Sequence, residues 1–387
     1  MKVLHVIPSV AQRDGGPARA VTGMCRALES LGVEAVIATT DADGPARLRD
    51  VRAGEFCSHA GARTIFFPRL ISSSFKWSPG LAAWLRAHVD RYDIVHVHAV
   101  FSHSTLAASR AAWRGHRPYL VRPLGSLAAW SLGHHARRKA VFLAAGLRAA
   151  LTRATGMHYT SAAERASAEH QLPWLPPGHV LGLGIDEEWF ERPSSEPQAE
   201  RVLLMLGRID RKKGIELAIA AAHHLAGNPA TGRWRLVIAG SGEPALEQEL
   251  RAQAAAGPAG PRIHFAGWVD GPERSRLVAG AAVSLHPSAQ ENFGLAAVEA
   301  LAAGVPVVVS PGVDLAPDIE ASRAGWVAER TAPALAACLS VILQDDEARR
   351  ERALRARPFA ERYRWERVGA SLRDLYGGVI VQHRSRA

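Results

Sequence analysis

Short apolar runs alternate with alanine-rich segments of helical length along most of the chain. In the first half the apolar runs are Val3–Ile7, Val33–Ala38, Thr64–Phe67, Ile94–Val97, Tyr119–Arg122, Met157–Thr160 and Val180–Leu183. Helical segments lie between them, for example Pro17–Leu31, Pro79–Val89, Ser104–Trp113 and Arg137–Thr152. This alternation is typical of repeated β-α-β units, in which parallel strands form a sheet that helices cover.

The same pattern restarts after a polar stretch rich in Pro and Ser at residues 191–200. The apolar runs of the second half are Val202–Leu206, Leu236–Ala239, Ile263–Ala266, Val283–His286 and Val305–Val309. We therefore predict an α/β protein with two doubly wound domains, at residues 1–188 and 189–362. Ligands of such domains bind beyond the carboxyl ends of the strands, so the loops that follow strands are the places to look for chemistry.

Composition excludes several classes of protein. The chain has 387 residues, of which 48% are hydrophobic and 22% are charged, so it can bury a large core and is not expected to be disordered. Its three cysteines lie far apart, which fits neither a zinc ribbon nor a disulfide framework. No apolar stretch reaches the ~18 residues of a membrane span, and the first apolar run is too short for a signal peptide. We expect a cytoplasmic protein.

The formal net charge is +10. A nucleic acid, an anionic membrane face and an anionic small substrate are three partners that such a charge can serve. We find no nucleic-acid-binding motif and expect no nucleic-acid partner. The basic segment at residues 134–148 is compatible with peripheral contact with an anionic membrane, and equally with an ordinary surface helix.

Two glycine-containing loops carry features of a phosphate site. Gly15 and Gly16 end the loop after the first strand, just before Pro17 starts a helix. The second domain opens with Gly207-Arg208 and Lys213-Gly214, which bring cations to a helix N-terminus. A planar guanidinium, an ammonium and a helix dipole together suit a diphosphate. The alternatives are an ordinary turn for the first loop and a solvated basic turn for the second.

Two later loops of the second domain add binding groups. The turn Gly240-Ser241-Gly242 follows a strand and is predicted to contact a nucleotide. The most informative segment contains Glu291, Asn292, Phe293, Gly294 and Glu299. Carboxylates accept hydrogen bonds from sugar hydroxyls, and a glycine at a helix start leaves N–H groups for a phosphate. The alternative is that Glu291 caps the helix and Glu299 pairs with an arginine.

Two possible metal sites are weaker. Asp41 and Asp43 form a D-x-D pattern, but they precede a turn where aspartates commonly make local hydrogen bonds. His96, His98 and His103 could bind a metal, since His96 and His98 share one face of a strand. No carboxylate that would support such ligands is evident, and His98 is better placed beside an acceptor or as a proton-handling group.

These motifs together resemble the retaining glycosyltransferases of family four, whose GT-B fold has two facing Rossmann-like domains. The resemblance covers nearly the whole chain, and Glu291-x7-Glu299 is its most specific part. It implies that residues 363–387, which contain Tyr363-Arg-Trp365, form a terminal helix that crosses back to the first domain, followed by a basic tail.

The resemblance also implies residue roles. Arg208 and Lys213 would hold the donor's diphosphate, Glu291 the hydroxyls of the donor sugar and Glu299 the ribose, while Gly16 would approach the diphosphate. Gly240, Gly242, Asn292, Phe293 and Gly294 would complete donor binding. No metal or other cofactor is implied, because cations and helix ends stabilise the leaving group. The partners would be a nucleotide-sugar donor and a glycan or lipid-linked acceptor.

One departure concerns the acceptor side. Many members of the family have a histidine in the loop after the fifth strand, where this chain has Leu124. We consider His98, Arg122 and Ser126 as substitutes. We therefore predict a retaining, metal-independent sugar transferase of bacterial surface polysaccharide or glycolipid synthesis, cytoplasmic or peripheral at the inner membrane face. A sugar-nucleotide epimerase and a non-catalytic binder of anionic ligands are the alternatives.

Overall fold

The computed structural model describes residues 1–71, 75–133, 136–191 and 200–385. The chain divides into two compact units. The first comprises Met1–Gly184 and Trp365–Ala387, and the second comprises Ile185–Arg364. Most of the polar stretch at 191–200 lies outside the described residues, as does the start of the basic segment at 134–148.

The first unit is built on an eight-stranded sheet with the order β10-β9-β8-β7-β1-β2-β6-β5. All neighbouring strands are parallel except β5 and β6. Its strands are β1 (Lys2–Val6), β2 (Glu34–Thr40), β5 (Phe56–His59), β6 (Ala62–Phe67), β7 (Ile94–His98), β8 (Tyr119–Arg122), β9 (Gly156–Tyr159) and β10 (Gly178–Val180). The direction of winding reverses between β1 and β7, so a doubly wound sheet has its switch point there.

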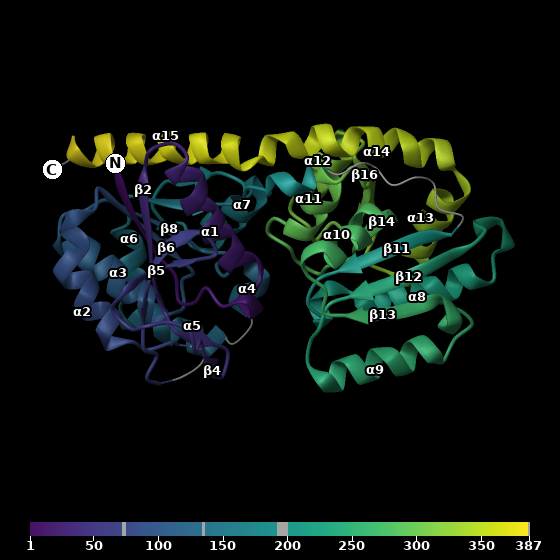
Figure 1. Cartoon of the computed structure of the whole chain (residues 1–387), viewed down its shortest axis with the longest axis horizontal. Helices are drawn as coiled ribbons and strands as arrows, with labels where there is room; N and C mark the ends of the chain where they lie inside the picture. The colour runs from purple at the N-terminus through teal and green to yellow at the C-terminus, as the bar shows by residue number, and fades with distance from the viewer. Residues whose placement is uncertain (72–74, 134–135, 192–199, 386–387) are drawn as a thin grey trace. The chain divides into compact units, whose positions relative to one another are not determined.

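Helices cover both faces of this sheet (Figure 1). They are α1 (Gly16–Glu29), α2 (Pro79–His88), α3 (His103–Arg114), α4 (Ala129–Gly133), α5 (Ala136–Phe142), α6 (Arg148–Thr152), α7 (Ala162–Gln171) and α15 (Trp365–Arg384). A small hairpin, β3 (Ala42–Asp43) and β4 (Ala46–Arg47), follows β2. The terminal helix α15 packs on α1 (Figure 1).

Small residues make the close packing of α15 possible. The Trp365 ring occupies the space where a Cβ on Gly23 of α1, or on Gly184, would lie. Gly369 of α15 similarly lies against Ala27 of α1, where a Cβ would come within 2.9 Å. Glycine is therefore required at these positions by the ring and the helix that lie against them.

The second unit has a six-stranded parallel sheet with the order β13-β12-β11-β14-β15-β16. Its strands are β11 (Arg201–Leu206), β12 (Trp234–Ala239), β13 (Ile263–Gly267), β14 (Ala281–His286), β15 (Val307–Val309) and β16 (Gly325–Val327). The helices are α8 (Ile215–Ala226), α9 (Pro244–Ala255), α10 (Gly271–Ala279), α11 (Leu295–Ala302), α12 (Ala316–Ala321), α13 (Ala332–Gln344) and α14 (Asp346–Ala360). If the six strands are numbered in sequence order within this unit, their order across the sheet is 3-2-1-4-5-6, as in the Rossmann fold. The switch point lies between β11 and β14.

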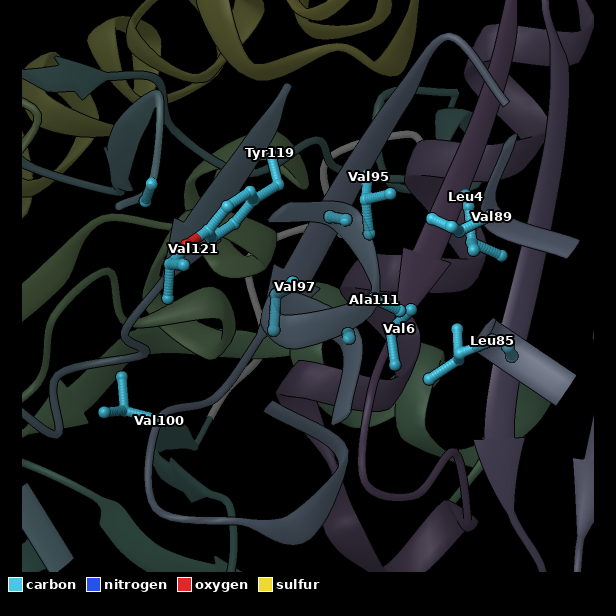
Figure 2. Packing of buried hydrophobic residues seen from close by; sticks show 14 of the residues in the cluster. Leu4, Val6, Leu85, Val89, Val95, Val97, Val100, Ala111, Tyr119 and Val121 are labelled. Atoms are coloured by element: carbon cyan, nitrogen blue, oxygen red, sulfur yellow. The ribbon is translucent and has the colours of Figure 1, made fainter. Parts of the chain in front are cut away.

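Each unit has its own apolar core. In the first unit alternate residues of neighbouring strands, such as Leu4, Val6, Val95 and Val97, pack together with Leu85 of α2 (Figure 2). In the second unit a separate cluster includes Leu203, Met205, Ile238 and Leu285. The predicted α/β class with two Rossmann-like domains is confirmed. No helix in the described residues is both long and apolar enough to span a membrane.

Three features differ from the sequence expectation. The helix predicted at Arg137–Thr152 is interrupted between α5 and α6, because Gly146 has a φ of 118° that an α-helix cannot contain. The strands β3, β4, β5 and β16 were not predicted, since they are short or lie at sheet edges and lack an apolar run. The run predicted at Val180–Leu183 forms a strand only at Gly178–Val180.

Candidate functional site

The second unit gathers the predicted donor residues at its switch point. β11 and β14 are neighbours, so the loops that follow them start at the same edge of the sheet. The first loop contains a 3-10 turn, Arg211–Lys213, and ends at Gly214, which caps α8. Gly214 has a φ of 72°, and a Cβ there would overlap the Pro287 carbonyl oxygen from the second loop. Glycine thus lets the two loops meet at the α8 N-terminus.

Lys213 and Glu291 are in direct contact where these loops meet. The Lys213 Nζ donates a hydrogen bond to the Glu291 Oε1, and the Lys212 Nζ lies 3.9 Å from the same oxygen. Both side chains of the Lys213–Glu291 pair remain partly accessible, at 24% and 17%. Burial lowers the pKa of Lys212, while Glu291 opposes that shift. The structure therefore brings together a cation and a carboxylate from distant segments.

Glu291 is not a cap of the following helix. α11 begins after Gly294, which has a φ of 71°, and no side chain caps it. The Glu291 backbone instead pairs with the segment around Gly312 and Val313, which fixes the direction of its side chain. Of the two functions considered for Glu291, the geometry leaves ligand binding open and does not support capping.

Arg208 lies in the first loop with its side chain exposed. Among the described residues it forms no ion pair, so its guanidinium is available to an anion. It lines a small pocket together with Leu206, Gly207, Lys213, His286 and Ser288. Burial, reinforced by the charge of Lys213, lowers the pKa of His286 to about 3, so this ring is neutral at physiological pH.

Glu299 lies on α11 in a more enclosed position. Its carboxylate accepts a hydrogen bond from Arg274 of α10, and only 5% of the side chain is exposed. The Arg274 guanidinium also lies 4.8 Å from the centre of the Trp189 ring. The ion pair that the sequence offered as an alternative for Glu299 is therefore present, and a ribose would have to share this carboxylate with Arg274.

The remaining predicted donor-side residues, Gly240, Gly242, Asn292 and Phe293, differ in how tightly they are packed and in whether they are hydrogen-bonded. Cβ atoms on Gly240 and Gly242 would overlap the carbonyl oxygens of Gly207 and Ile209, so both glycines are required for loop packing, whatever they contact in addition. The Phe293 ring is buried and packs edge-to-face on Tyr363. The Asn292 Nδ2 is buried and has no hydrogen-bond partner within the described residues.

In the first unit, Gly16 is the first residue of α1, and Gly15 before it has a φ of 67°. This loop follows β1, as the sequence predicted, and β1 borders the switch point of the sheet. The three predicted acceptor-side residues, His98, Arg122 and Ser126, differ in their burial and hydrogen bonds. Ser126 is used locally, because its hydroxyl donates to the Pro123 carbonyl. His98 and Arg122 are buried and adjacent, since they pair in register at the ends of β7 and β8.

His98 belongs to a cluster of buried histidines on one face of the sheet. His5, His96 and His98 form the one group in the described part of the chain whose nitrogens are close enough to share a metal ion, within 4.8 Å of one another. His103, which the sequence grouped with His96 and His98, instead accepts a hydrogen bond from the Ser78 N–H beside Phe75 and Trp77.

The hydrogen bonds of this cluster do not favour a cation. The Leu181 carbonyl accepts from His158 Nε2, so His158 Nδ1 accepts from His96 Nε2 and His96 Nδ1 accepts from Tyr376. Both nitrogens of His96 are therefore engaged. The guanidinium of Arg122, which is buried nearby, would also repel a metal ion.

The other possible metal pair is also engaged with the protein. Asp41 Oδ1 accepts from the Arg69 N–H, and its second oxygen lies 3.9 Å from Arg47. Asp43 pairs with Arg13 at 3.7 Å. The D-x-D pattern thus has the local partners that its turn context predicted.

Sequence reasoning missed several residues of these sites. Strand alternation could have placed His5 and His158 on the face that carries His96 and His98, because each lies in a predicted strand. Lys212 and His286 adjoin predicted residues. Arg274 and Tyr376 carry no sequence signal, since only tertiary packing brings them to Glu299 and His96.

Two family models match consecutive parts of the chain. The model described as "Glycosyl transferase 4-like domain" matches residues 15–184, and the one described as "Glycosyl transferases group 1" matches residues 186–358.

Among curated proteins, the chain is 36% identical over 216 residues to a GDP-mannose-dependent alpha-(1-6)-phosphatidylinositol dimannoside mannosyltransferase of Mycobacterium tuberculosis. The matched region covers 53% of each of the two chains. It is 34% identical over 202 residues to a phosphatidyl-myo-inositol mannosyltransferase of Mycolicibacterium smegmatis, covering 48% of each. The chain thus matches these relatives over about half of their length.

Solved structures match over nearly the whole chain. Sucrose-phosphate synthase from Thermosynechococcus elongatus has a TM-score of 0.80 at 21% identity, covering 99% of this chain and 100% of that one. The Anabaena protein Alr3699/HepE in complex with UDP and glucose has a TM-score of 0.77 at 17% identity, covering 98% and 100%. At these identities the likeness concerns the fold.

Proposed function

We propose a reaction for this chain on the premise that it belongs to the glycosyl transferases of group 1. It transfers a sugar from a nucleotide diphosphate sugar to an acceptor hydroxyl, and the anomeric configuration of the sugar is retained. The observation that carries the proposal is the contact between Lys213 and Glu291 at the N-terminus of α8. A sugar diphosphate needs a cation for its phosphates and a carboxylate for its hydroxyls within one sugar's length, and this pair offers both.

The residues of the second unit have distinct roles in this proposal. Arg208, which is exposed in the same loop, and Lys213 bind the diphosphate and stabilise the charge that develops as it leaves. Glu291 exchanges part of its contact with Lys213 for the hydroxyls of the donor sugar. Glu299, oriented by Arg274, accepts hydrogen bonds from the ribose. We propose that no metal is required, because these cations and the helix N-terminus supply the positive charge.

The relatives support the class of substrates. Two are named as mannosyltransferases acting on phosphatidylinositol or its dimannoside, and one of them as GDP-mannose-dependent. A structural neighbour was solved with UDP and glucose. We propose a nucleotide-sugar donor, a glycan or lipid-linked acceptor, and a role in bacterial surface polysaccharide or glycolipid synthesis at the inner face of the cell membrane.

Thermal unfolding with UDP, GDP and dTDP tests the donor site. A nucleotide at about 100 times its dissociation constant adds roughly 2.7 kcal/mol to stability, so one of the three should raise the melting temperature. The Lys213→Ala variant should lose this rise. The matched control is Arg211→Ala, because Arg211 lies in the same turn but is exposed and pairs with Glu249. No rise with any nucleotide, or equal rises in both variants, would contradict the phosphate site.

The reaction is then followed by proton NMR with the matching nucleotide sugar. The anomeric coupling of the first product should equal that of the donor. An inverted product would rule out retention. Conversion of the donor to an isomeric nucleotide sugar without any acceptor would instead identify an epimerase.

A further inference from the structure

One face of the sheet in the first unit is polar although it is buried. Alternate residues of β1, β7, β8 and β9 place His5, His96, His98, Arg122 and His158 on the face opposite the apolar core. His5 and His96 pair in register, as do His98 and Arg122. All five side chains are at most 2% exposed. Burying so many polar groups is costly unless each one is hydrogen-bonded.

The inner half of this face is fully hydrogen-bonded. Tyr376 donates to His96, His96 donates to His158, and His158 donates to the Leu181 carbonyl. These bonds fix the tautomers of both rings, and every ring nitrogen has a partner. The inner residues therefore need no ligand.

The outer half, at the carboxyl ends of the strands, is not satisfied. His5 Nδ1 and His98 Nε2 share one hydrogen bond of 2.9 Å, which leaves His5 Nε2 and His98 Nδ1 buried without partners. Whichever ring donates, one of these two nitrogens carries a proton with no acceptor. Arg122 Nε and Nη1 are also buried donors that lack an acceptor among the described residues.

Within the described part of the chain, no carboxylate forms an ion pair with Arg122. Glu164 is the carboxylate that raises the pKa of Arg122. However, its oxygens accept hydrogen bonds from the Gly125 N–H and from the N–H and hydroxyl of Thr160. Burial lowers the pKa of Arg122 only to about 10, so the guanidinium remains charged at neutral pH. A buried cation with unused hydrogen-bond donors can bind an anionic ligand, which then supplies the counter-ion.

Backbone strain is present at the same strand ends. Ala99, directly after His98, has a φ of 69°, and Leu124, two residues after Arg122, has a φ of 55°. Neither residue is a glycine, so both conformations are strained. The Ala99 N–H donates to the Arg122 carbonyl, which links the two strained segments.

We propose that Arg122 and His98 bind an anionic group of the acceptor, a phosphate or a carboxylate, at the carboxyl ends of β7 and β8. The guanidinium supplies the charge and the N–H donors of Nε and Nη1, and the histidine pair supplies a further N–H donor. This proposal rests on the proposed transferase function and adds that the acceptor is charged at the end held by the first unit. The site adjoins the β1–β7 switch point, because β7 borders it, and ligands of doubly wound sheets bind at such points.

Inorganic phosphate is the first probe. It is titrated into the protein while the melting temperature is followed, with sodium chloride at equal ionic strength as the reference. The nucleoside diphosphate identified in the second unit is kept saturating, so that phosphate does not bind at Lys213. The wild type should show a saturable rise with phosphate, Arg122→Met should show none, and Arg122→Lys should show a smaller one. Arg114→Met, at an exposed arginine of α3, is the control and should behave as the wild type.

The phosphate-free proteins separate a binding role from a structural one. Because Nε and Nη1 of the buried Arg122 guanidinium lack hydrogen-bond partners among the described residues, Arg122→Met should melt at the same temperature as the wild type or higher. A marked fall in its melting temperature would show that the guanidinium supports the fold, and would overturn the proposal. So would an equal phosphate effect in wild type and Arg122→Met, or none in the wild type.

Two further measurements complete the test. Acetate in place of phosphate tells whether a carboxylate or only a phosphate is accepted. Stabilisation by the nucleoside diphosphate should be the same in wild type and Arg122→Met. If that stabilisation is present while phosphate has no effect, the acceptor proposal fails and the transferase proposal stands.

Discussion

Lys213 and Glu291 are 78 residues apart in the sequence, and their side chains are hydrogen-bonded at the carboxyl edge of the second sheet. In the absence of a ligand, each of these two charges is neutralised by the other. A bound donor can divide the pair, because its phosphates attract the ammonium and its hydroxyls attract the carboxylate. A single substitution in this pair should therefore affect diphosphate binding and sugar transfer to different extents.

Glu291→Gln should separate binding from catalysis. The amide keeps the size of the side chain and removes the negative charge beside Lys213, so a nucleoside diphosphate should bind as well as, or better than, it binds the wild type. The transfer rate should fall by about 10²–10³-fold if the carboxylate acts on the sugar in the transition state. Calorimetric titration and a transfer assay measure the two quantities. A variant with the wild-type rate would show that Glu291 only neutralises Lys213.

Arg274→Ala should destabilise the second unit. It removes the Arg274 guanidinium from the carboxylate of Glu299, whose side chain is only 5% exposed. Loss of one partner of such a buried pair typically costs about 3–5 kcal/mol. Denaturant unfolding measures the loss. The double variant Arg274→Ala/Glu299→Gln should recover part of it, because no buried charge remains, and a further loss would contradict this account.

Gly240→Ala should also destabilise the second unit. Gly240 has a φ of 149°, and a Cβ would overlap the Gly207 carbonyl oxygen, which is part of the backbone and cannot rotate away. Strain and overpacking of this kind together cost about 2–4 kcal/mol. Gly227→Ala is the matched control, since nothing lies within 4 Å of its Cβ position. Similar melting temperatures for both variants would argue against the close contact of the two loops.

The stability of the first unit should fall in mild acid. Burial, reinforced by the charge of Arg122, lowers the pKa of His5 and of His158 to about 3 from the ordinary histidine value of about 6.5. The unfolded chain therefore binds more protons than the folded one as the pH falls below about 6.5. Each of these histidines contributes stability that is fully present above that pH and is lost towards about pH 3, at about 1.4 kcal/mol per pH unit.

Denaturant unfolding from about pH 7 to about pH 4 measures this dependence. In His158→Gln the slope of the unfolding free energy against pH should be smaller than in the wild type by about 1.4 kcal/mol per pH unit. An unchanged slope would mean that His158 is protonated in the folded protein. The same experiment on His88→Gln is a control, because His88 is only partly buried, on α2.

Chelation should leave nucleotide binding unchanged. In the proposed function, Arg208, Lys213 and the α8 N-terminus supply the positive charge for the diphosphate, and no metal ion is required. The melting-temperature rise produced by the nucleoside diphosphate should therefore be equal with and without EDTA. A rise that needs magnesium or manganese would contradict the proposal, and would return attention to Asp41 and Asp43, which pair with Arg47 and Arg13 in this structure.

Much of the fold follows from local pattern. Apolar runs predicted the main strands of both sheets, because a strand buried on both faces needs apolar residues at nearly every position. The run Tyr119–Arg122 coincides with β8, including its buried arginine. The short edge strands β5 and β16 were missed, since their residues are partly exposed and their pairing is decided by neighbours.

The sequence by itself determined the two Rossmann-like units and the loops that carry Lys213, Glu291 and Gly16, because strand ends and helix starts are encoded within a few neighbouring residues. Only the tertiary structure decided which charges meet. It joined Arg274 to Glu299 and Tyr376 to His96, and it left Arg122 buried beside His98 with unmatched donors. The reason is physical: hydrogen bonds and desolvation depend on contacts between segments far apart in the chain, and no local pattern contains that information.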